Sequence, residues 1–476
     1  MTHIFPDTLF ADHRYAVLGL GRNGSPAAIA LAQMGASVQA WDDSEQARNG
    51  LLALIARQPA DIQNRLTLAP PETFDGFSAL VLSPGIPHIL PAPHPAAARA
   101  RAAGIPVLSD AELLFQAVRK AGSKARFAGI TGTNGKSTTT TLLAYILEQA
   151  GMPVAAGGNL GPAALSLPLL PDNGVYVLEM SSYMLERLES MHFDVACLLN
   201  LTPDHLDRHD GMSGYTEAKK QIFKGQTQND LAVVGIEDNF CRAVIDELRT
   251  KNCNCITISG NPDEPQADIF ADGKILRRKT EKLASAGPAL PGSHNVQNAA
   301  AAWAMAEFLG VNPDVIRQCL SSFAGLPHRQ KIVVQHQGVT FIDDSKATNA
   351  DATARALDCY ENLIWIAGGI AKEGGIDSLS SYFPRIRHAF LIGRDAEKLA
   401  ETLRAHQVPF TVAGTLDKAV PAAFAEAKSS QTPVVLLSPA CASFDQFSGF
   451  EARGLYFQQL AQALTNPSVS QPGESI

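Results

Sequence analysis

A glycine-rich segment in the first third of the chain carries residue types that can hold phosphate groups. It lies between an apolar run, Arg126–Ile130, and a helix-forming stretch, Thr139–Ala150, and reads Gly132-Thr133-Asn134-Gly135-Lys136-Ser137-Thr138. Glycines permit a tight backbone that aims N–H groups at phosphates, a lysine supplies a cation for the γ-phosphate, and a serine hydroxyl can bind Mg²⁺. Ile130 replaces the first glycine of the usual phosphate-loop pattern, so this loop is a variant. The strand–loop–helix context nevertheless predicts an ATP site.

A second glycine-rich turn lies near the N-terminus, where Tyr15–Leu18 is followed by Gly19-Leu20-Gly21-Arg22-Asn23-Gly24. The next predicted strand, Ala36–Trp41, ends at Asp42, the place of a ribose-binding acid in dinucleotide-binding folds. A further loop after Ala79–Leu82 reads Ser83-Pro84-Gly85-Ile86-Pro87. These patterns fit NAD, a UDP-sugar or a turn without a ligand, and the residues alone do not separate NAD from UDP.

The elements that must position these loops alternate along the chain. Short apolar runs alternate with Ala-rich helical stretches, which predicts βαβ units and an α/β fold with parallel sheets. The length of 476 residues implies two or three domains. Turn residues cluster near 104–106 and 324–327, so we expect domains at 1–109, 110–325 and 326–476, with a Ser-, Pro- and Gly-rich, disordered tail over 465–476.

Composition excludes several classes of protein. A net charge of −8 lacks the basic footprint of a nucleic-acid binder. The seven cysteines are scattered without a zinc or redox spacing, which predicts reduced, mostly buried thiols. The sequence shows neither a signal peptide nor an apolar stretch long enough to span a membrane, so we expect a soluble cytoplasmic protein.

Several motifs together resemble one enzyme family. The phosphate loop is similar to the ATP signature of the Mur ligases and of their folylpolyglutamate synthase relatives, and the later motifs follow in that family's order. They are Gly158–Gly161, Glu179–Tyr183, Asn200–Arg208, His294–Ala299, Asp344–Asn349, Gly368-Gly369 with Lys372, and Ser438–Phe447. The resemblance covers residues 14–460 and implies a Rossmann-like N-terminal domain, a central P-loop ATPase-like domain and a C-terminal Rossmann-like domain. The last three motifs are most similar to the family member that adds D-glutamate to UDP-N-acetylmuramoyl-L-alanine.

The resemblance also implies the roles of individual residues in the ATP site. ATP would be held by Gly132 to Thr138, by Asn295 and Asn298, and by Arg329 and Asp344. Two Mg²⁺ ions would be held by Ser137, Glu179, His205 and a carbamate formed from CO₂ on Lys219. Lys136, Glu179, His205, Lys219 and Lys346 would form the catalytic set. From the residues alone, Lys219 reads as an ordinary helix lysine. Glu179, at a strand end near the phosphate loop, is placed where a hard cation is expected, with a helix N-terminal acid as the alternative, and Asn295 can also be a helix cap.

The substrate contacts follow in the same way. The UDP-sugar would meet Asn23, Asp42, Ser83, Gly85, Asn159 and His205, and D-glutamate would meet Thr348, Lys372, Ser443 and Phe450. The first-domain contacts depart from the family pattern, because Asp42 is followed by Asp43 and Ser44 where an arginine is common. We expect a monomer that forms the amide bond through an acyl phosphate. The alternatives are a folylpolyglutamate-type ligase, an NAD-dependent oxidoreductase and a UDP-sugar sensor.

Overall fold

The computed structural model describes residues 4–264, 266–372 and 374–465. It divides into two compact units, the first formed by residues up to 286 together with 295–322, and the second by 287–294 together with the chain from 323. The predicted tail lies outside the described residues from 466 onward, whereas Thr465 ends the last helix rather than belonging to a disordered tail.

The first sheet of unit 1 has five parallel strands in the order β3-β2-β1-β4-β5. Its strands are β1 (Arg14–Leu18), β2 (Ser37–Trp41), β3 (Leu66–Leu68), β4 (Ala79–Leu82) and β5 (Val107–Leu108), and its helices are α1 (Gly24–Gln33), α2 (Glu45–Ile55), α3 (Ala60–Gln63) and α4 (Pro95–Ala102). All four residues of β4 are buried, as expected for a strand covered on both faces. The glycine-rich turn and the Ser83–Pro87 loop follow β1 and β4, so they lie at the same edge of the sheet.

The second sheet of unit 1 has nine strands in the order β14-β13-β12-β11-β10-β9-β6-β8-β7. They are β6 (Arg126–Thr131), β7 (Val154–Gly158), β8 (Val175–Glu179), β9 (Val195–Leu198), β10 (Leu231–Gly235), β11 (Cys255–Ser259), β12 (Ile269–Asp272), β13 (Ile275–Arg278) and β14 (Glu281–Ser285). The strands from β7 to β12 are parallel, and β12, β13 and β14 form an antiparallel meander. The phosphate loop leaves β6, which is central in the parallel part.

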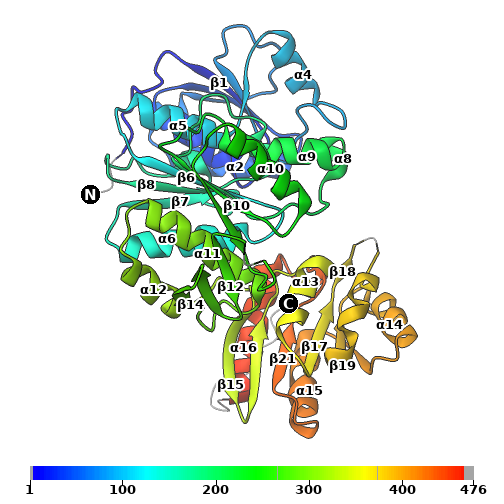
Figure 1. The fold of residues 1–476 in the computed structure, drawn as a ribbon. Coiled ribbons are helices and arrows are strands. Elements are labelled where there is room, and N and C mark those ends of the chain that lie inside the picture. The colour runs from blue at the N-terminus through cyan, green and yellow to red at the C-terminus, as the bar shows by residue number, and fades with distance from the viewer. Residues whose placement is uncertain (1–3, 265, 373, 466–476) are drawn as a thin grey trace. The chain divides into compact units, whose positions relative to one another are not determined.

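Helices cover both faces of this sheet. Figure 1 shows α6 and α12 on one face and α5 and α10 on the other. The helices of this region are α5 (Asp110–Lys120), α6 (Lys136–Gln149), α7 (Ser182–Leu185), α8 (Leu206–His209), α9 (Gly211–Lys220), α10 (Asn239–Thr250), α11 (Ser293–Phe308) and α12 (Pro313–Ser322), with 3₁₀ helices η1 (Ala164–Ser166) and η2 (Gln221–Phe223). One continuous cluster of buried apolar side chains includes β1, α1, α5, β8 and α10, so the two sheets of unit 1 share a core.

Unit 2 is built on a six-stranded sheet in the order β15-β16-β21-β17-β19-β20. Its elements are β15 (Lys331–His336), β16 (Val339–Asp343), α13 (Ala350–Cys359), β17 (Leu363–Gly368), β18 (Ile370–Ala371), η3 (Asp377–Arg385), β19 (Ile386–Ile392), α14 (Ala396–Ala405), β20 (Phe410–Gly414), α15 (Leu416–Ser429), β21 (Val434–Leu437), β22 (Cys441–Ala442) and α16 (Phe450–Thr465). Only β15 runs antiparallel in this sheet. Separate apolar clusters cover its two faces, as the alternating strand–helix pattern predicts.

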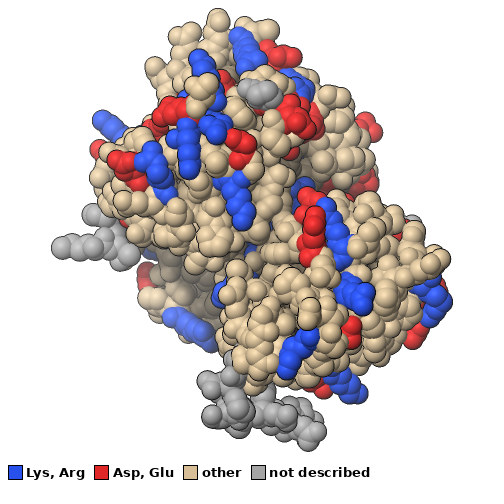
Figure 2. Space-filling model, turned by 60° about the horizontal axis from the view of Figure 1, so that its bottom comes forward, with Lys and Arg blue, Asp and Glu red and all other residues tan. Residues whose placement is uncertain are grey.

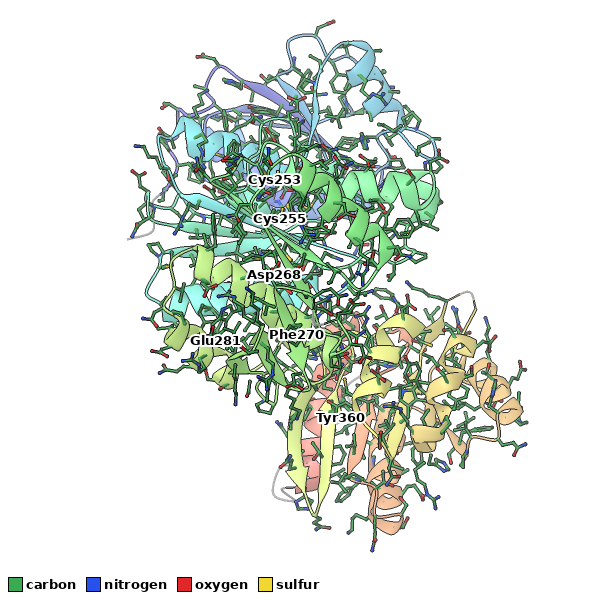
Figure 3. The ribbon with its side chains drawn as sticks, viewed as in Figure 1. Cys253, Cys255, Asp268, Phe270, Glu281 and Tyr360 are labelled. Carbon is green, nitrogen blue, oxygen red and sulfur yellow. The ribbon has the colours of Figure 1, made fainter. Side chains whose placement is uncertain are left out.

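The surface and the cysteines agree with the composition. Lys and Arg side chains are interspersed with Asp and Glu over the face shown in Figure 2. All seven cysteines are free, and four of them are buried, which agrees with the expectation of mostly buried thiols. Cys253 and Cys255 lie beside each other at the start of β11 (Figure 3), and the Cys255 thiol donates to the Cys253 carbonyl oxygen at 3.3 Å.

Candidate functional site

The phosphate loop has the backbone that its glycines predict. Gly135 caps the N-terminus of α6 with φ 87°, and Gly132 has φ 147°, both in the region that favours glycine. A side chain on Gly135 would meet Asn298 Oδ1 at 2.3 Å, so the loop also needs glycine for space. Lys136 Nζ donates to the carbonyl oxygens of Gly132 and Thr133, each at 2.8 Å. The lysine is thus bent over the loop that would hold phosphates.

The segment after β9 holds the other side of this loop. Asn200 Oδ1 accepts a hydrogen bond from the Asn134 amide at 2.9 Å, and Thr133 Oγ1 donates to the Thr202 carbonyl at 3.1 Å. Thr133 Oγ1 also lies 3.2 Å from the hydroxyl of Tyr215, on α9. The predicted Asn200–Arg208 motif therefore supports the loop through Asn200 and Thr202. Tyr215 was not predicted as a site residue, because a lone tyrosine on a helix carries no signal in sequence.

The two asparagines of α11 reach the same loop. Asn298 Nδ2 donates to Asn295 Oδ1 at 3.0 Å, so the predicted pair does share one face of the helix. Asn298 Oδ1 accepts from Thr139 Oγ1 at 3.2 Å, and only 2% of the residue is exposed. Asn298 thus supports the start of α6, and a contact of this pair with adenine remains a prediction.

Glu179 ends β8, directly beside β6, from which the phosphate loop departs. Its Oε1 accepts a hydrogen bond from Asn159 Nδ2 at 2.7 Å. Its Oε2 is buried and has no hydrogen-bond partner among the described residues. A buried carboxylate oxygen without a donor is costly, and a hard cation such as Mg²⁺ would satisfy it. The donor set formed by Glu179 and the Ser137 hydroxyl, in the first turn of α6, fits a Mg²⁺ ion.

Lys219 is buried in α9, with 2% of the residue exposed. Its Nζ donates to the Gly132 carbonyl at 2.9 Å and to Thr131 Oγ1 at 3.3 Å. Burial lowers the pKa of Lys219 well below its usual value, and the positive charge of Lys136 lowers it further. Carbamate formation requires an amine without its extra proton, and Lys219 provides such an amine beside the phosphate loop.

Lys220, the next residue, has a different environment. Its Nζ forms ion pairs with Glu217 at 2.6 Å and with Glu247 at 2.9 Å. Although burial acts to lower it, these two hydrogen bonds raise the pKa of Lys220 overall. Lys220 is therefore a charged helix lysine, and the pKa values of the two neighbouring lysines are shifted in opposite directions.

His205 adopts the left-handed conformation at φ 53°, and about half of its side chain is exposed (51%). Its Nε2 lies 3.5 Å from Asp204 Oδ2, and its ring centroid lies 5.2 Å from that of Tyr183. Burial lowers the pKa of His205, and the nearby positive charges of Lys219 and Lys136 lower it too. A neutral imidazole is the form that can bind a metal ion.

The candidate UDP contacts of the first sheet mainly hold its own turns. Asp42 Oδ2 accepts from the Leu20 amide at 2.7 Å and Oδ1 from the Ser44 amide at 2.8 Å. Ser83 Oγ donates to the Gly19 carbonyl at 2.8 Å. Asn23 Nδ2 lies 3.4 Å from Asp110 Oδ2. Gly85 is exposed, and a Cβ there would have no atom within 4 Å.

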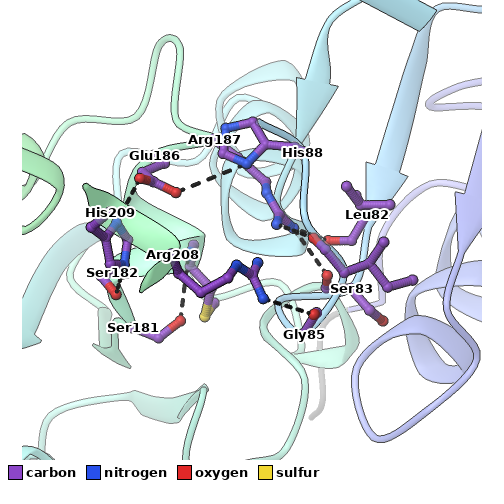
Figure 4. A network of polar contacts seen from close by, with 12 residues as sticks. Leu82, Ser83, Gly85, His88, Ser181, Ser182, Glu186, Arg187, Arg208 and His209 are labelled. Carbon is purple, nitrogen blue, oxygen red and sulfur yellow. Dashed lines mark hydrogen bonds and ion pairs between the residues drawn. The ribbon is translucent and has the colours of Figure 1, made fainter. Parts of the chain in front are cut away.

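Two arginines reach the Ser83–Pro87 loop: Arg208, which ends the predicted Asn200–Arg208 motif, and Arg187, which lies in no motif of the sequence. Figure 4 shows Arg187 bonded to the carbonyls of Leu82 and Ser83, and Arg208 bonded to that of Gly85. Both come from the segments between β8 and α9 that also carry Glu179 and His205. No motif marks Arg187 in the sequence, since its partners lie about a hundred residues earlier.

In unit 2, Asp344 lies at the end of β16 and is almost fully buried. Its Oδ2 accepts from Ser438 Oγ at 2.7 Å, and its Oδ1 accepts from the Gln330 amide at 3.2 Å. Burial raises the pKa of Asp344 to about 7, although the Ser438 hydrogen bond and the charge of Arg329 oppose this shift. Arg329 and Asp344 thus lie near each other in unit 2, and their contact with ATP remains a prediction.

The candidate acceptor residues gather at one edge of the same sheet. Lys346 Nζ lies 5.1 Å from the centre of the Phe450 ring. The pairing of β18 with β22 joins Ala371 to Cys441, which brings together the chain segments that carry the exposed Lys372 and the buried Ser443. Thr348 is partly buried near Lys346, and its amide donates to the Lys346 carbonyl at 2.9 Å.

A buried arginine, Arg453, connects the loops of this edge. Its Nη2 and Nε donate to the carbonyl oxygen and the Oγ of Ser345 at 2.8 and 3.0 Å. Its Nη1 lies 3.1 Å from the Cys441 carbonyl and 3.4 Å from the Gly368 carbonyl. Ser345 Oγ in turn donates to the Phe450 carbonyl at 2.9 Å. Arg453 thus fixes the positions of the segments around Gly368, Cys441 and Phe450 relative to Ser345.

Among the described residues, no helix is long and apolar enough to cross a membrane.

Comparison with known proteins identifies the family. Residues 130–306 match the Mur ligase middle domain, and residues 328–441 match the Mur ligase glutamate ligase domain. The chain is 50% identical over 460 residues to a UDP-N-acetylmuramoylalanine–D-glutamate ligase from Paramagnetospirillum magneticum, covering 96% of this chain and 97% of that protein. It is 44% identical to the protein of the same name from Rhodospirillum rubrum, covering 99% of each.

Solved structures share the fold. A UDP-N-acetylmuramate–alanine ligase from Thermotoga maritima superposes with a TM-score of 0.61 at 16% identity, covering 96% of this chain and 99% of that one. A folylpolyglutamate synthase from the same organism superposes with a TM-score of 0.51 at 14% identity, covering 76% and 94%. The α/β fold with parallel sheets, predicted from the sequence, is confirmed. The two domain matches and the 50% identity over 96% of the chain show that the chain belongs to the Mur ligase family and is an ATP-dependent ligase.

Proposed function

We propose that this enzyme joins D-glutamate to UDP-N-acetylmuramoyl-L-alanine, with ATP converted to ADP and phosphate, as a step of peptidoglycan precursor synthesis. The observation that carries the proposal is the 50% identity, over 96% of the chain, to a ligase of that name. The phosphate loop, the half-satisfied Glu179 and the buried Lys219 support it, because they assemble the phosphoryl-transfer chemistry in one unit.

The reaction needs activation because a carboxylate is a poor electrophile. An oxygen of the substrate carboxylate attacks the γ-phosphorus of ATP, ADP leaves, and an acyl phosphate forms. The amine of D-glutamate then attacks the acyl carbon, and the amide forms as inorganic phosphate leaves with that carboxylate oxygen. The protein must neutralise charge on the phosphate and hold the reactants in line.

The residues of unit 1 divide this work. Lys136 and the loop from Gly132 to Thr138 hold the phosphates of ATP, and Asn295 and Asn298 hold its adenine. Mg²⁺ bound by Ser137, Glu179, His205 and a carbamate on Lys219 would neutralise the transferring phosphate. The low pKa of Lys219 supports the carbamate, since only a neutral amine adds CO₂.

The remaining contacts complete the proposal. Arg329 and Asp344 also bind ATP, and Lys346 meets the transferring phosphate. D-Glutamate binds at Thr348, Lys372, Ser443 and Phe450, and the UDP-sugar at Asn23, Asp42, Ser83, Gly85, Asn159 and His205. Residues 1–109, 110–325 and 326–476 would then serve as UDP-sugar, ATP and amino-acid domains. We place the enzyme in the cytoplasm as a monomer, and its free cysteines support a reducing compartment.

An omission assay tests this function. Phosphate release is measured with ATP, Mg²⁺, the UDP-sugar substrate and D-glutamate, and each component is then left out in turn. We expect release only from the complete mixture. Release with a folate acceptor in place of the UDP-sugar would instead assign the folylpolyglutamate-type reaction.

A further inference from the structure

The loop after β4 has an excess of hydrogen-bond acceptors. Two of its five residues are prolines, Pro84 and Pro87, which have no N–H to donate. Several carbonyls of the loop therefore need donors from elsewhere, because a buried carbonyl without a donor is costly. Those donors are guanidinium groups from the segments between β8 and α9.

Arg187 supplies most of them. Its Nη1 donates to the carbonyls of Leu82 at 2.7 Å and Ser83 at 3.0 Å, and its Nη2 donates to that of Ile86 at 2.7 Å. Only 2% of the residue is exposed. Burying a guanidinium is expensive, and an apolar side chain would fill the same space at lower cost. A planar fork, however, can hold three carbonyls in one fixed arrangement.

Arg208 adds a contact at the exposed turn of the same loop. Its Nη1 donates to the Gly85 carbonyl at 3.1 Å, and its guanidinium lies 4.5 Å above the Tyr183 ring. Tyr183 also lies against His205, which precedes Arg208 by three residues. The loop is thus tied to the segment that carries a predicted metal-binding histidine.

The residue before Arg187 fixes the position of this arginine. Glu186 Oε1 lies 2.9 Å from His209 Nδ1, and its Oε2 lies 3.9 Å from Nδ1 of His88, next to the loop (Figure 4). His209 Nε2 in turn lies 2.9 Å from Ser182 Oγ. These contacts bind α7 to α8, from which the two arginines extend.

We propose that Arg187 is a positioning residue for the nucleotide-sugar substrate, acting through the Ser83–Pro87 loop, with Arg208 holding the exposed end of that loop. This inference rests on the proposed function. A loop already held in its binding conformation loses less entropy when substrate binds, so loosening it weakens binding of the molecule that contacts it. ATP and D-glutamate contact other segments and are unaffected.

The test compares kinetic constants of the full-length enzyme and its Arg187→Lys variant. Lysine keeps the positive charge but cannot hold three carbonyls in a fixed plane. We expect the KM for UDP-N-acetylmuramoyl-L-alanine to rise about tenfold, because the loss of one charge-assisted hydrogen bond typically lowers affinity by about that factor. The KM values for ATP and D-glutamate should change less than about twofold, which is within the scatter of surface changes.

Arg119→Lys is the matched control. Arg119 Nη1 also donates to two carbonyls, those of Ser123 and Ala125, each at 2.9 Å, but it lies outside the substrate loop. Its replacement should lower thermal stability without a selective change in any KM. A merely structural role of Arg187 predicts the same result for both variants.

The outcomes separate this inference from the proposed function. Suppose that the wild type is active but the three KM values of Arg187→Lys are unchanged or change together. That result overturns the inference and leaves the proposed function standing. A wild type that releases no phosphate overturns both. If Arg187→Lys does not fold, Arg208→Lys replaces it, because Arg208 is only partly buried, and the same selective rise in KM is expected.

Discussion

Glu179 and Asn159 are joined by a 2.7 Å hydrogen bond that uses one carboxylate oxygen of Glu179 and leaves the other buried without a donor among the described residues. The bond fixes the direction of the carboxylate. The open oxygen lies at the end of β8, next to the strand that leads into the phosphate loop. This is the geometry of a group prepared to accept a cation.

Replacement of Glu179 by glutamine should therefore weaken metal use. The amide keeps the size of the side chain but loses its charge, so we expect kcat to fall at least about 100-fold, as for loss of a principal electrostatic contact. Raising the Mg²⁺ concentration should restore part of the activity. Phosphate release is measured against Mg²⁺ concentration, with the exposed Glu148→Gln as control. An unchanged Mg²⁺ dependence would remove Glu179 from the metal site.

Lys136→Ala should abolish phosphate release from ATP. Nζ of Lys136 lies over the loop, bonded to two of its carbonyls, where a bound γ-phosphate would compete for it. We expect a loss of about 100-fold or more in kcat and an unchanged circular-dichroism spectrum. Full turnover by a folded Lys136→Ala protein would refute the phosphate-loop assignment.

Lys219→Ala should be strongly impaired and partly rescued by short-chain carboxylic acids. The small acid would fill the space of the lost side chain and supply the carboxylate that the carbamate provides. Lys220→Ala is the control, because Lys220 pairs with Glu217 and Glu247 instead of facing the loop. Rescue is measured as phosphate release against acid concentration. Loss of activity without rescue would count against the carbamate, and no loss at all would exclude it.

Asp344 should make the free energy of unfolding depend on pH. Its pKa is raised from 3.8 to about 7 by burial, so the folded state keeps a proton that the unfolded state releases. Its contribution is favourable below about pH 4, is lost as the pH rises toward about 7, and stays lost above that. Asp344→Asn should remove this slope, whereas Asp351→Asn, on the exposed side of α13, should keep it. Urea unfolding at about pH 4.5 and about pH 7.5 measures the difference, and an equal slope in both variants would contradict the raised pKa.

Local patterns predicted the elements that carry the chemistry. The apolar run before the phosphate loop became β6, whose last five residues are all buried, as expected for a parallel strand covered on both faces, and the stretch after it became α6. The predicted motif that begins at Asp344 directly follows β16. The family resemblance then supplied roles for Glu179 and Lys219 that their local sequence would not have suggested, and the structure gives both residues unusual surroundings.

Long-range partners could not be predicted. The carbonyls held by Arg187 are more than a hundred residues away in sequence, so only the fold brings them together. Both oxygens of Asp42 accept backbone amides of its own turn, which its place after the second strand did not predict, and its contact with the UDP-sugar stays a prediction. The antiparallel meander from β12 to β14 was likewise not predicted, since its short strands carry little apolar alternation.

The most direct test of the central claim is the mass of the nucleotide product after incubation with ATP, Mg²⁺ and UDP-N-acetylmuramoyl-L-alanine, with either D-glutamate or L-glutamate. The account predicts a product heavier by one glutamyl residue with D-glutamate, one phosphate released for each product molecule, and no such product with L-glutamate. A nucleotide sugar of unchanged mass in the presence of D-glutamate would contradict it.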